Sequence, residues 1–110
     1  MEAVCVKIRL KPGSENRVRE WARELTRRRP EALETLRDEG VVLESAFLGR
    51  DAEGEYLVYY MRAADLKRAF AVAGRSVHPI DAYHRAFKEA TWVKQEPLEL
   101  LVDLDRTDER

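Results

Sequence analysis

The run Tyr56–Met61 (YLVYYM) restricts the fold more than any other stretch, because every side chain in it is apolar or aromatic. Residues of these types favour β-strands, in which successive side chains point to opposite faces of the sheet. A strand with one face in water alternates apolar with polar residues instead. We therefore expect both faces of this strand to be covered, which requires a layer of structure on each side of the sheet.

The remaining patterns place this strand in a definite order of elements. Alternating side chains predict strands over residues 3–10, 41–49, 55–61 and 98–104. Three- and four-residue spacing predicts a helix from the expected cap Ser14 to Gly40, with a kink or a new helix at Pro30. Two shorter helices follow, one from Asp65 to Gly74 and one from Pro79 to about residue 91.

This order is β-α-β-β-α-α-β, and the two late helices can be counted as one split element. The pattern is then βαββαβ, the α+β arrangement called ferredoxin-like, in which helices cover one face of an antiparallel sheet. We expect one domain over residues 1–105 and a flexible polar tail over residues 106–110.

The face of the sheet turned away from the helices needs its own cover. On the first strand we assign Cys5, Lys7 and Arg9 to this face. On the second strand we assign to it the more polar of the two alternating sets of side chains, which includes Glu44. Because the helices account for only one face, the simplest cover is the sheet of a second copy. The sequence therefore predicts a homodimer formed through the open sheet face.

Composition narrows the expected surroundings. The chain has 20 basic and 21 acidic residues, so we expect no nucleic-acid partner, since phosphate binding depends on uncompensated positive charge. No apolar run approaches the roughly 20 residues that span a bilayer, so we expect no membrane partner. The single cysteine, Cys5, suits a reducing compartment, and we expect a cytoplasmic protein.

Three segments carry a resemblance to a known group of proteins: Val42–Leu48, Tyr56–Met61 and His78–His84. With the element order, they resemble the dimeric α/β-barrel superfamily, most closely an uncharacterised family of small bacterial proteins and more distantly the antibiotic-biosynthesis-type monooxygenases. The resemblance implies two ferredoxin-like protomers packed sheet to sheet, each with a cavity between its sheet and its helices. The Asn, Trp and His set of the haem-degrading branch has no match, because Asn16 and Trp21 fall in the first helix. We expect no cofactor.

Two residues are candidates for catalysis. His84 shares the inward side of its helix with Ile80 and Phe87, and Asp81, three residues earlier, could orient its imidazole. It is either a base that contacts a ligand or a half-buried histidine that only packs. Glu44 lies between apolar neighbours in a strand and is either a base in the cavity or the partner of Lys7 or Arg9 in an interface ion pair.

Further candidates for ligand contact are Tyr83, Asp81, His78 and Tyr59. Each has a structural alternative: His78 precedes Pro79 and suits a helix start, and strand tyrosines usually pack. His78 and His84 are six residues apart, which places them on different sides of a helix, so we expect no metal site.

Three functions remain open from the sequence. The first is a dimer that binds a small apolar or aromatic molecule between sheet and helices. The second is a cofactor-independent monooxygenase- or isomerase-like enzyme with His84 or Glu44 as the base. The third is a purely structural or interaction dimer.

Overall fold

The computed structural model describes residues 1–108. The first strand is β1 (Glu2–Leu10), and it is followed by helices α1 (Glu15–Arg27) and α2 (Arg29–Glu39). A hairpin of β2 (Val41–Asp51) and β3 (Gly54–Ala63) comes next, followed by α3 (Leu66–Gly74) and α4 (Pro79–Thr91). The last strand is β4 (Trp92–Pro97), and a 3-10 turn, η1, spans Arg106–Asp108.

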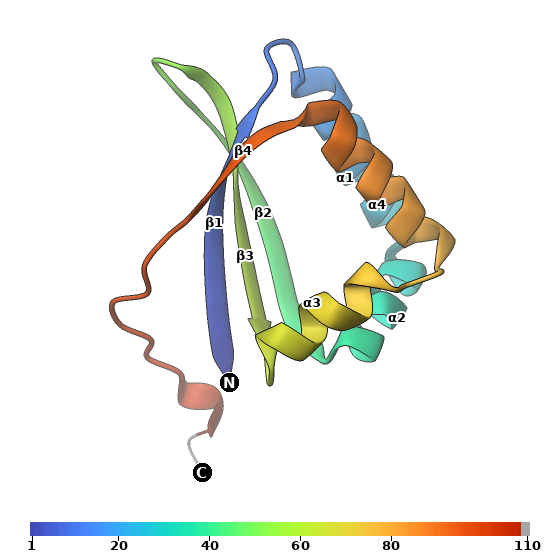
Figure 1. Cartoon of the computed structure of the whole chain (residues 1–110), viewed down its shortest axis with the longest axis vertical. Coiled ribbons are helices and arrows are strands. Elements are labelled where there is room, and N and C mark those ends of the chain that lie inside the picture. Colours follow the sequence, from blue (N-terminus) through green and yellow to red (C-terminus); the bar gives the residue numbers. More distant parts are fainter. Residues whose placement is uncertain (109–110) are drawn as a thin grey trace.

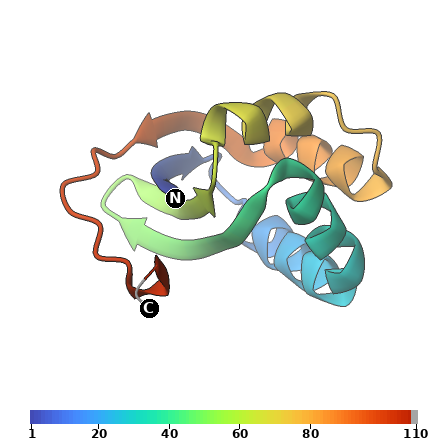
Figure 2. The same ribbon diagram turned by 90° about the horizontal axis from the view of Figure 1, so that it is seen from below.

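The four strands form one antiparallel sheet in the order β2-β3-β1-β4. All four helices lie on one side of this sheet (Figures 1 and 2). This confirms the predicted α+β ferredoxin-like fold, with the central pair β1 and β3 flanked by β2 and β4. None of the helices within residues 1–108 is long and apolar enough to cross a bilayer.

Local sequence explains most element boundaries. Pro30 lies in the first turn of α2, so the chain starts a new helix there, the second of the two outcomes expected at this proline. Gly40 ends α2 in the left-handed conformation with φ 74°, and Asp65 caps α3 by accepting a hydrogen bond from the Arg68 backbone N–H at 3.0 Å. Ser14 precedes α1, but its side chain makes no cap hydrogen bond.

The predicted last strand over residues 98–104 is wrong. The chain forms β4 at Trp92–Pro97, directly after α4, and Lys11 N–H bonds to the Thr91 carbonyl at 2.8 Å where the two meet. The segment 98–105 then leaves the sheet on the side away from the helices (Figure 1). Within this segment, Asp103 and Asp105 bind Arg62. Residues 106–108 of the expected tail form η1, and residues 109–110 lie outside the described residues.

The core on the helix side has two parts. One consists of buried side chains from β1, β3, α1 and α4: Ile8, Leu10, Val18, Trp21, Leu57 and Phe87. The other lies beneath α2 and α3 and consists of Val41, Ala63 and Ala69. Each helix pair thus packs on its own part of the sheet, and space is left between the two packed regions.

Candidate active site

A cavity of about 530 Å³ lies between the sheet and the helices, in the range typical of small-molecule sites. Its walls are largely apolar and come from every strand and from α1 to α4. The polar and charged side chains that line it include Thr26, Arg29, Thr35, Glu39, Glu44, Tyr59, Asp81, His84, Lys88 and Gln95. Such a lining suits a molecule with both apolar and hydrogen-bonding parts.

Glu44 and Tyr59 form a pair on the floor of this cavity. The Tyr59 hydroxyl donates a hydrogen bond to Glu44 Oε1, which joins neighbouring positions on β2 and β3. Burial raises the pKa of Glu44, and the hydrogen bond from Tyr59 opposes this only in part. Burial and the nearby carboxylate hold the pKa of Tyr59 well above its usual value. The hydroxyl therefore remains protonated and acts as the donor.

This position of Glu44 corrects its predicted place on the open sheet face. Val41 faces the helices as expected, but the β2–β3 register shifts between Val41 and Leu43, where β2 has a bulge. Because strand side chains alternate, every β2 side chain beyond the bulge lies on the face opposite to the one predicted for it. Leu43 and Phe47 therefore lie on the open face, and Glu44 lies on the helix face.

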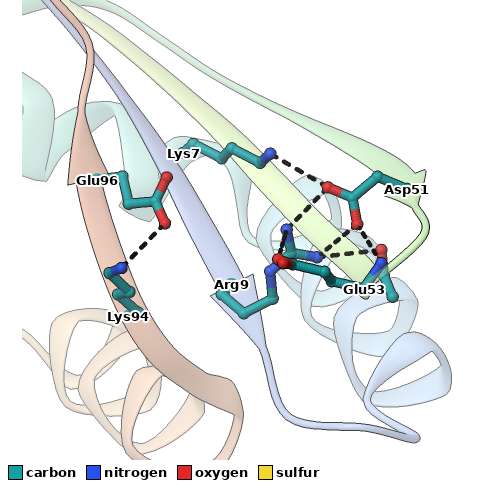
Figure 3. Close-up of polar contacts among 7 residues, drawn as sticks. Lys7, Arg9, Asp51, Glu53, Lys94 and Glu96 are labelled. Atoms are coloured by element: carbon teal, nitrogen blue, oxygen red, sulfur yellow. Dashed lines mark hydrogen bonds and ion pairs between the residues drawn. The ribbon is translucent and has the colours of Figure 1, made fainter.

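Lys7 and Arg9, the expected partners of Glu44, instead bind Asp51 at the end of β2 (Figure 3). The Arg9 guanidinium contacts both Asp51 oxygens, at 3.0 and 2.8 Å, and Lys7 Nζ lies 3.2 Å from Oδ2. The hydrogen bond from Arg9 and, to a lesser extent, that from Lys7 hold the pKa of Asp51 far below its usual value. Glu53 also pairs with Arg9, so this end of the open face carries a charged cluster.

His84 is fixed by a residue that sequence reasoning did not connect to it. Trp21 Nε1 of α1 donates a hydrogen bond to His84 Nδ1 of α4 at 3.1 Å. The two rings stack at 5.7 Å, and the Trp21 ring also lies against Phe87 at 4.4 Å. Burial, and then the positive charges of Lys88 and Arg85, lower the pKa of His84 to about 4.

The Trp21 contact defines the tautomer of His84. An indole N–H can only donate, so Nδ1 must be the acceptor. The imidazole is neutral near pH 7, and its single proton is therefore on Nε2. Asp81 does not orient the ring, because its carboxylate accepts a hydrogen bond from Ser76 Oγ. His84 thus offers the cavity an N–H donor.

The other predicted ligand contacts are separated by the fold. Tyr59 and Asp81 line the cavity. His78 lines a second space of about 260 Å³, and its Nε2 lies 2.7 Å from Asp38 Oδ2, a contact that raises the pKa of His78. Within residues 1–108, Tyr83 is not one of the side chains that line the main cavity. The guanidinium of Arg17 lies over its ring.

Glu39 is a site residue that sequence reasoning missed. It is the last residue of α2, is only 9% exposed, and lines both the main cavity and the second space. Burial, followed by the like charges of Glu44, Asp81 and Asp38, raises its pKa to about 7, against the opposing effect of His78. The sequence did contain a signal for Glu39, because a carboxylate in the last turn of a helix is disfavoured by the negative end of the helix dipole.

No group of three or more His, Cys, Asp or Glu side chains within residues 1–108 is arranged to hold a metal ion. The polar side chains that line the described cavity carry carboxyl, phenol, hydroxyl, imidazole, amide, amine and guanidinium groups. These groups can bind hydroxyl or carbonyl oxygens and can exchange protons with them.

The fold and cavity define the chain as a ferredoxin-like α+β protein with a small-molecule-sized space on the helix side of its sheet. The chain belongs to a family of unknown function, DUF6176, whose model matches residues 1–109. No curated protein matches this chain. Among solved structures, L-rhamnose mutarotase from Formosa agariphila superposes with a TM-score of 0.66 and is 20% identical, covering 96% of this chain and 100% of the mutarotase. At this identity the similarity establishes the fold.

Proposed function

We propose that the protein is a cofactor-independent isomerase that binds a small hydroxylated molecule in the cavity and moves protons within it. The observation that carries this proposal is the placement of Glu44, bonded to Tyr59, in one cavity with a neutral His84 held by Trp21. The rings of Tyr59 and His84 are 6.2 Å apart, so the carboxyl and imidazole groups act on one small volume.

Glu44 is the stronger candidate for the base. His84 Nδ1 already accepts the Trp21 hydrogen bond, and Nε2 carries the ring proton, so neither nitrogen is free to accept another proton without breaking this arrangement. Burial raises the pKa of Glu44, which strengthens the carboxylate as a base. We therefore assign proton removal to Glu44 and hydrogen-bond donation to His84.

The reaction class that we favour is the interconversion of hemiacetal anomers. Its support is the fold shared with a protein named as a sugar mutarotase, together with a lining that combines apolar walls with several donors and acceptors. Ring opening needs one group that takes the proton of the anomeric hydroxyl and another that gives a proton to the ring oxygen. Closure on the other face reverses both transfers, so no cofactor is consumed.

The test is exchange spectroscopy by NMR between the two anomeric protons of L-rhamnose, extended to other reducing hexoses. We expect the wild-type protein to accelerate exchange with at least one sugar, and Glu44→Gln to reduce the rate about 10²-fold or more. Gln keeps an acceptor for the Tyr59 hydroxyl but cannot take a proton. Glu53→Gln is the matched control, because Glu53 is exposed on the hairpin turn, and it should leave the rate unchanged.

Binding without a reaction is the second candidate, and the apolar part of the cavity lining favours it. It predicts that small aromatic or apolar compounds raise the melting temperature of the protein while no sugar undergoes faster exchange. In that case Glu44→Gln would change the affinity alone. Acceleration of anomer exchange that disappears in Glu44→Gln would instead support the isomerase.

For the assembly we propose a homodimer through the open sheet face. Phe47 is 61% exposed on this face and Leu43 is 42% exposed, and both lie on the edge strand β2. Segment 98–105 adds exposed apolar side chains nearby, including Leu101 at 86% and Leu104 at 89%. A second copy would cover these groups, and the charged cluster around Asp51 contains both signs and can pair with itself across a two-fold axis.

A further inference from the structure

Glu39 occupies a position that is unfavourable for a carboxylate in three independent ways. It is 9% exposed, although burial of a carboxylate without a partner is costly. It is the last residue of α2, where the helix dipole repels negative charge. Within residues 1–108 it makes neither a hydrogen bond nor an ion pair through its side chain. A position with these costs would be better filled by Gln if it served only for packing.

The cavity explains where this carboxyl group is directed. Glu39 lines the main cavity together with Glu44 and Asp81, and both of these carboxylates act on it electrostatically. The neighbouring Asp38, by contrast, is satisfied by His78. Glu39 is therefore a buried, unpartnered polar side chain that faces the same space as the proposed base.

We infer that Glu39 is the second proton-transfer residue of the cavity and acts as the acid opposite Glu44. This assignment rests on the proposed function. In the ring-opening step Glu44 takes the proton of the anomeric hydroxyl, and the C1–O1 bond becomes a carbonyl. The bond between C1 and the ring oxygen breaks, its electron pair stays on that oxygen, and the oxygen takes the proton of Glu39.

Ring closure restores both residues. The hydroxyl formed from the ring oxygen returns its proton to Glu39 as it attacks C1 from either face. The carbonyl oxygen takes its proton back from Glu44, so no net proton is gained or lost. The pair must therefore begin with one carboxyl protonated and the other ionised, and mutual repulsion between two nearby buried carboxylates favours that state.

The experiment compares Glu39→Gln and Glu39→Asp with Glu34→Gln, a matched control on the exposed side of the same helix. The measurements are anomer exchange of L-rhamnose or of the best sugar found, recorded from pH 5 to 9, and a carbon NMR titration of the Glu39 carboxyl. For Glu39→Gln we expect kcat to fall about 10²-fold with KM changed only a few-fold. The limb of the pH profile near neutrality should disappear in this variant, and Glu39→Asp should recover part of the rate.

The outcomes separate the two proposals. If wild type accelerates exchange and Glu44→Gln abolishes it while Glu39→Gln keeps both rate and pH profile, the assignment of Glu39 is overturned and the isomerase stands. If wild type accelerates exchange of no sugar, both fail. A melting temperature of Glu39→Gln at pH 8 equal to or above that of wild type shows that a lost rate does not come from unfolding.

Discussion

At the scale of single residues, the Trp21–His84 contact decides what the histidine can do. The imidazole on α4 is buried against the indole of α1, and its proton is directed to Nε2 by a group that can only donate. A histidine on the inward side of this helix was predicted from spacing alone. The tautomer of this histidine could not be predicted, because its partner Trp21 lies 63 residues away in the sequence.

The pH dependence of stability tests this contact. The pKa of His84 is about 4 in the folded protein and about 6.5 when unfolded, so the unfolded chain binds more protons between these values. The His84 contribution to stability is fully present above pH 6.5 and is lost as pH falls toward 4. We expect wild type to lose roughly 2–3 kcal/mol of unfolding free energy over this window relative to His84→Asn.

Urea unfolding of both proteins at several pH values measures this difference, and nitrogen NMR of the imidazole identifies the tautomer directly. Trp21→Phe keeps the ring packing but removes the donor, so it should raise the pKa of His84. Nδ1 found protonated in wild type at neutral pH would refute the assignment.

At the scale of elements, Gly49 and Tyr56 show how the open face of the hairpin packs. These residues are opposite each other on β2 and β3, and a Cβ on residue 49 would lie 2.5 Å from the Tyr56 ring. The tyrosine therefore lies across the glycine, where Lys7 Nζ approaches the ring centre at 4.5 Å. A Cβ at this position would therefore require the ring to move.

We expect Gly49→Ala to displace the Tyr56 ring and to destabilise the protein by about 1–3 kcal/mol, the usual cost of overpacking. Thermal unfolding measures the loss. Gly74→Ala is a suitable control, because a Cβ there meets no atom within 4 Å. Equal melting temperatures for Gly49→Ala and wild type would contradict the packing described here.

The sequence predicted the elements well wherever a local signal was sufficient. Pro30, Gly40 and Asp65 mark helix ends through their own backbone or side-chain chemistry, and the structure confirms those ends. The alternation over residues 98–104 does not form a strand: β1 pairs with residues 92–97 on that side, and the Leu98 N–H still bonds to the Cys5 carbonyl at 2.9 Å before the chain leaves the sheet. The bulge at the start of β2 left no sequence signal, yet it reverses the face of every later residue, including Glu44.

At the scale of the whole molecule, the two faces of the sheet have different roles. The helix face holds the cavity, and the open face carries Phe47 and Leu43 at one part and the charged cluster of Lys7, Arg9 and Asp51 at another (Figure 3). The apolar side chains on the helix face of β3 are explained by the core around Leu57. Those on the other face are explained by the proposed partner.

Light scattering after size exclusion tests the partner. We expect wild type to elute at micromolar concentration with twice the 12.8 kDa mass of one chain. Phe47→Asp should weaken association about 10²-fold or more, because it places a charge in the proposed apolar interface. Val77→Asp is the control, since Val77 is 94% exposed on the α3–α4 connection. A wild-type mass of 12.8 kDa would overturn the dimer.

The cavity is built from two kinds of element. Its floor is a hydrogen-bonded sheet, and many of the polar groups that line it project from helices. Side chains on α1, α2 and α4 can therefore change while the strand ladder stays intact. The fold itself is shared with a solved mutarotase structure that is 20% identical to this chain. Substitutions at these helix positions would change the lining of the cavity without changing the hydrogen bonds of the sheet.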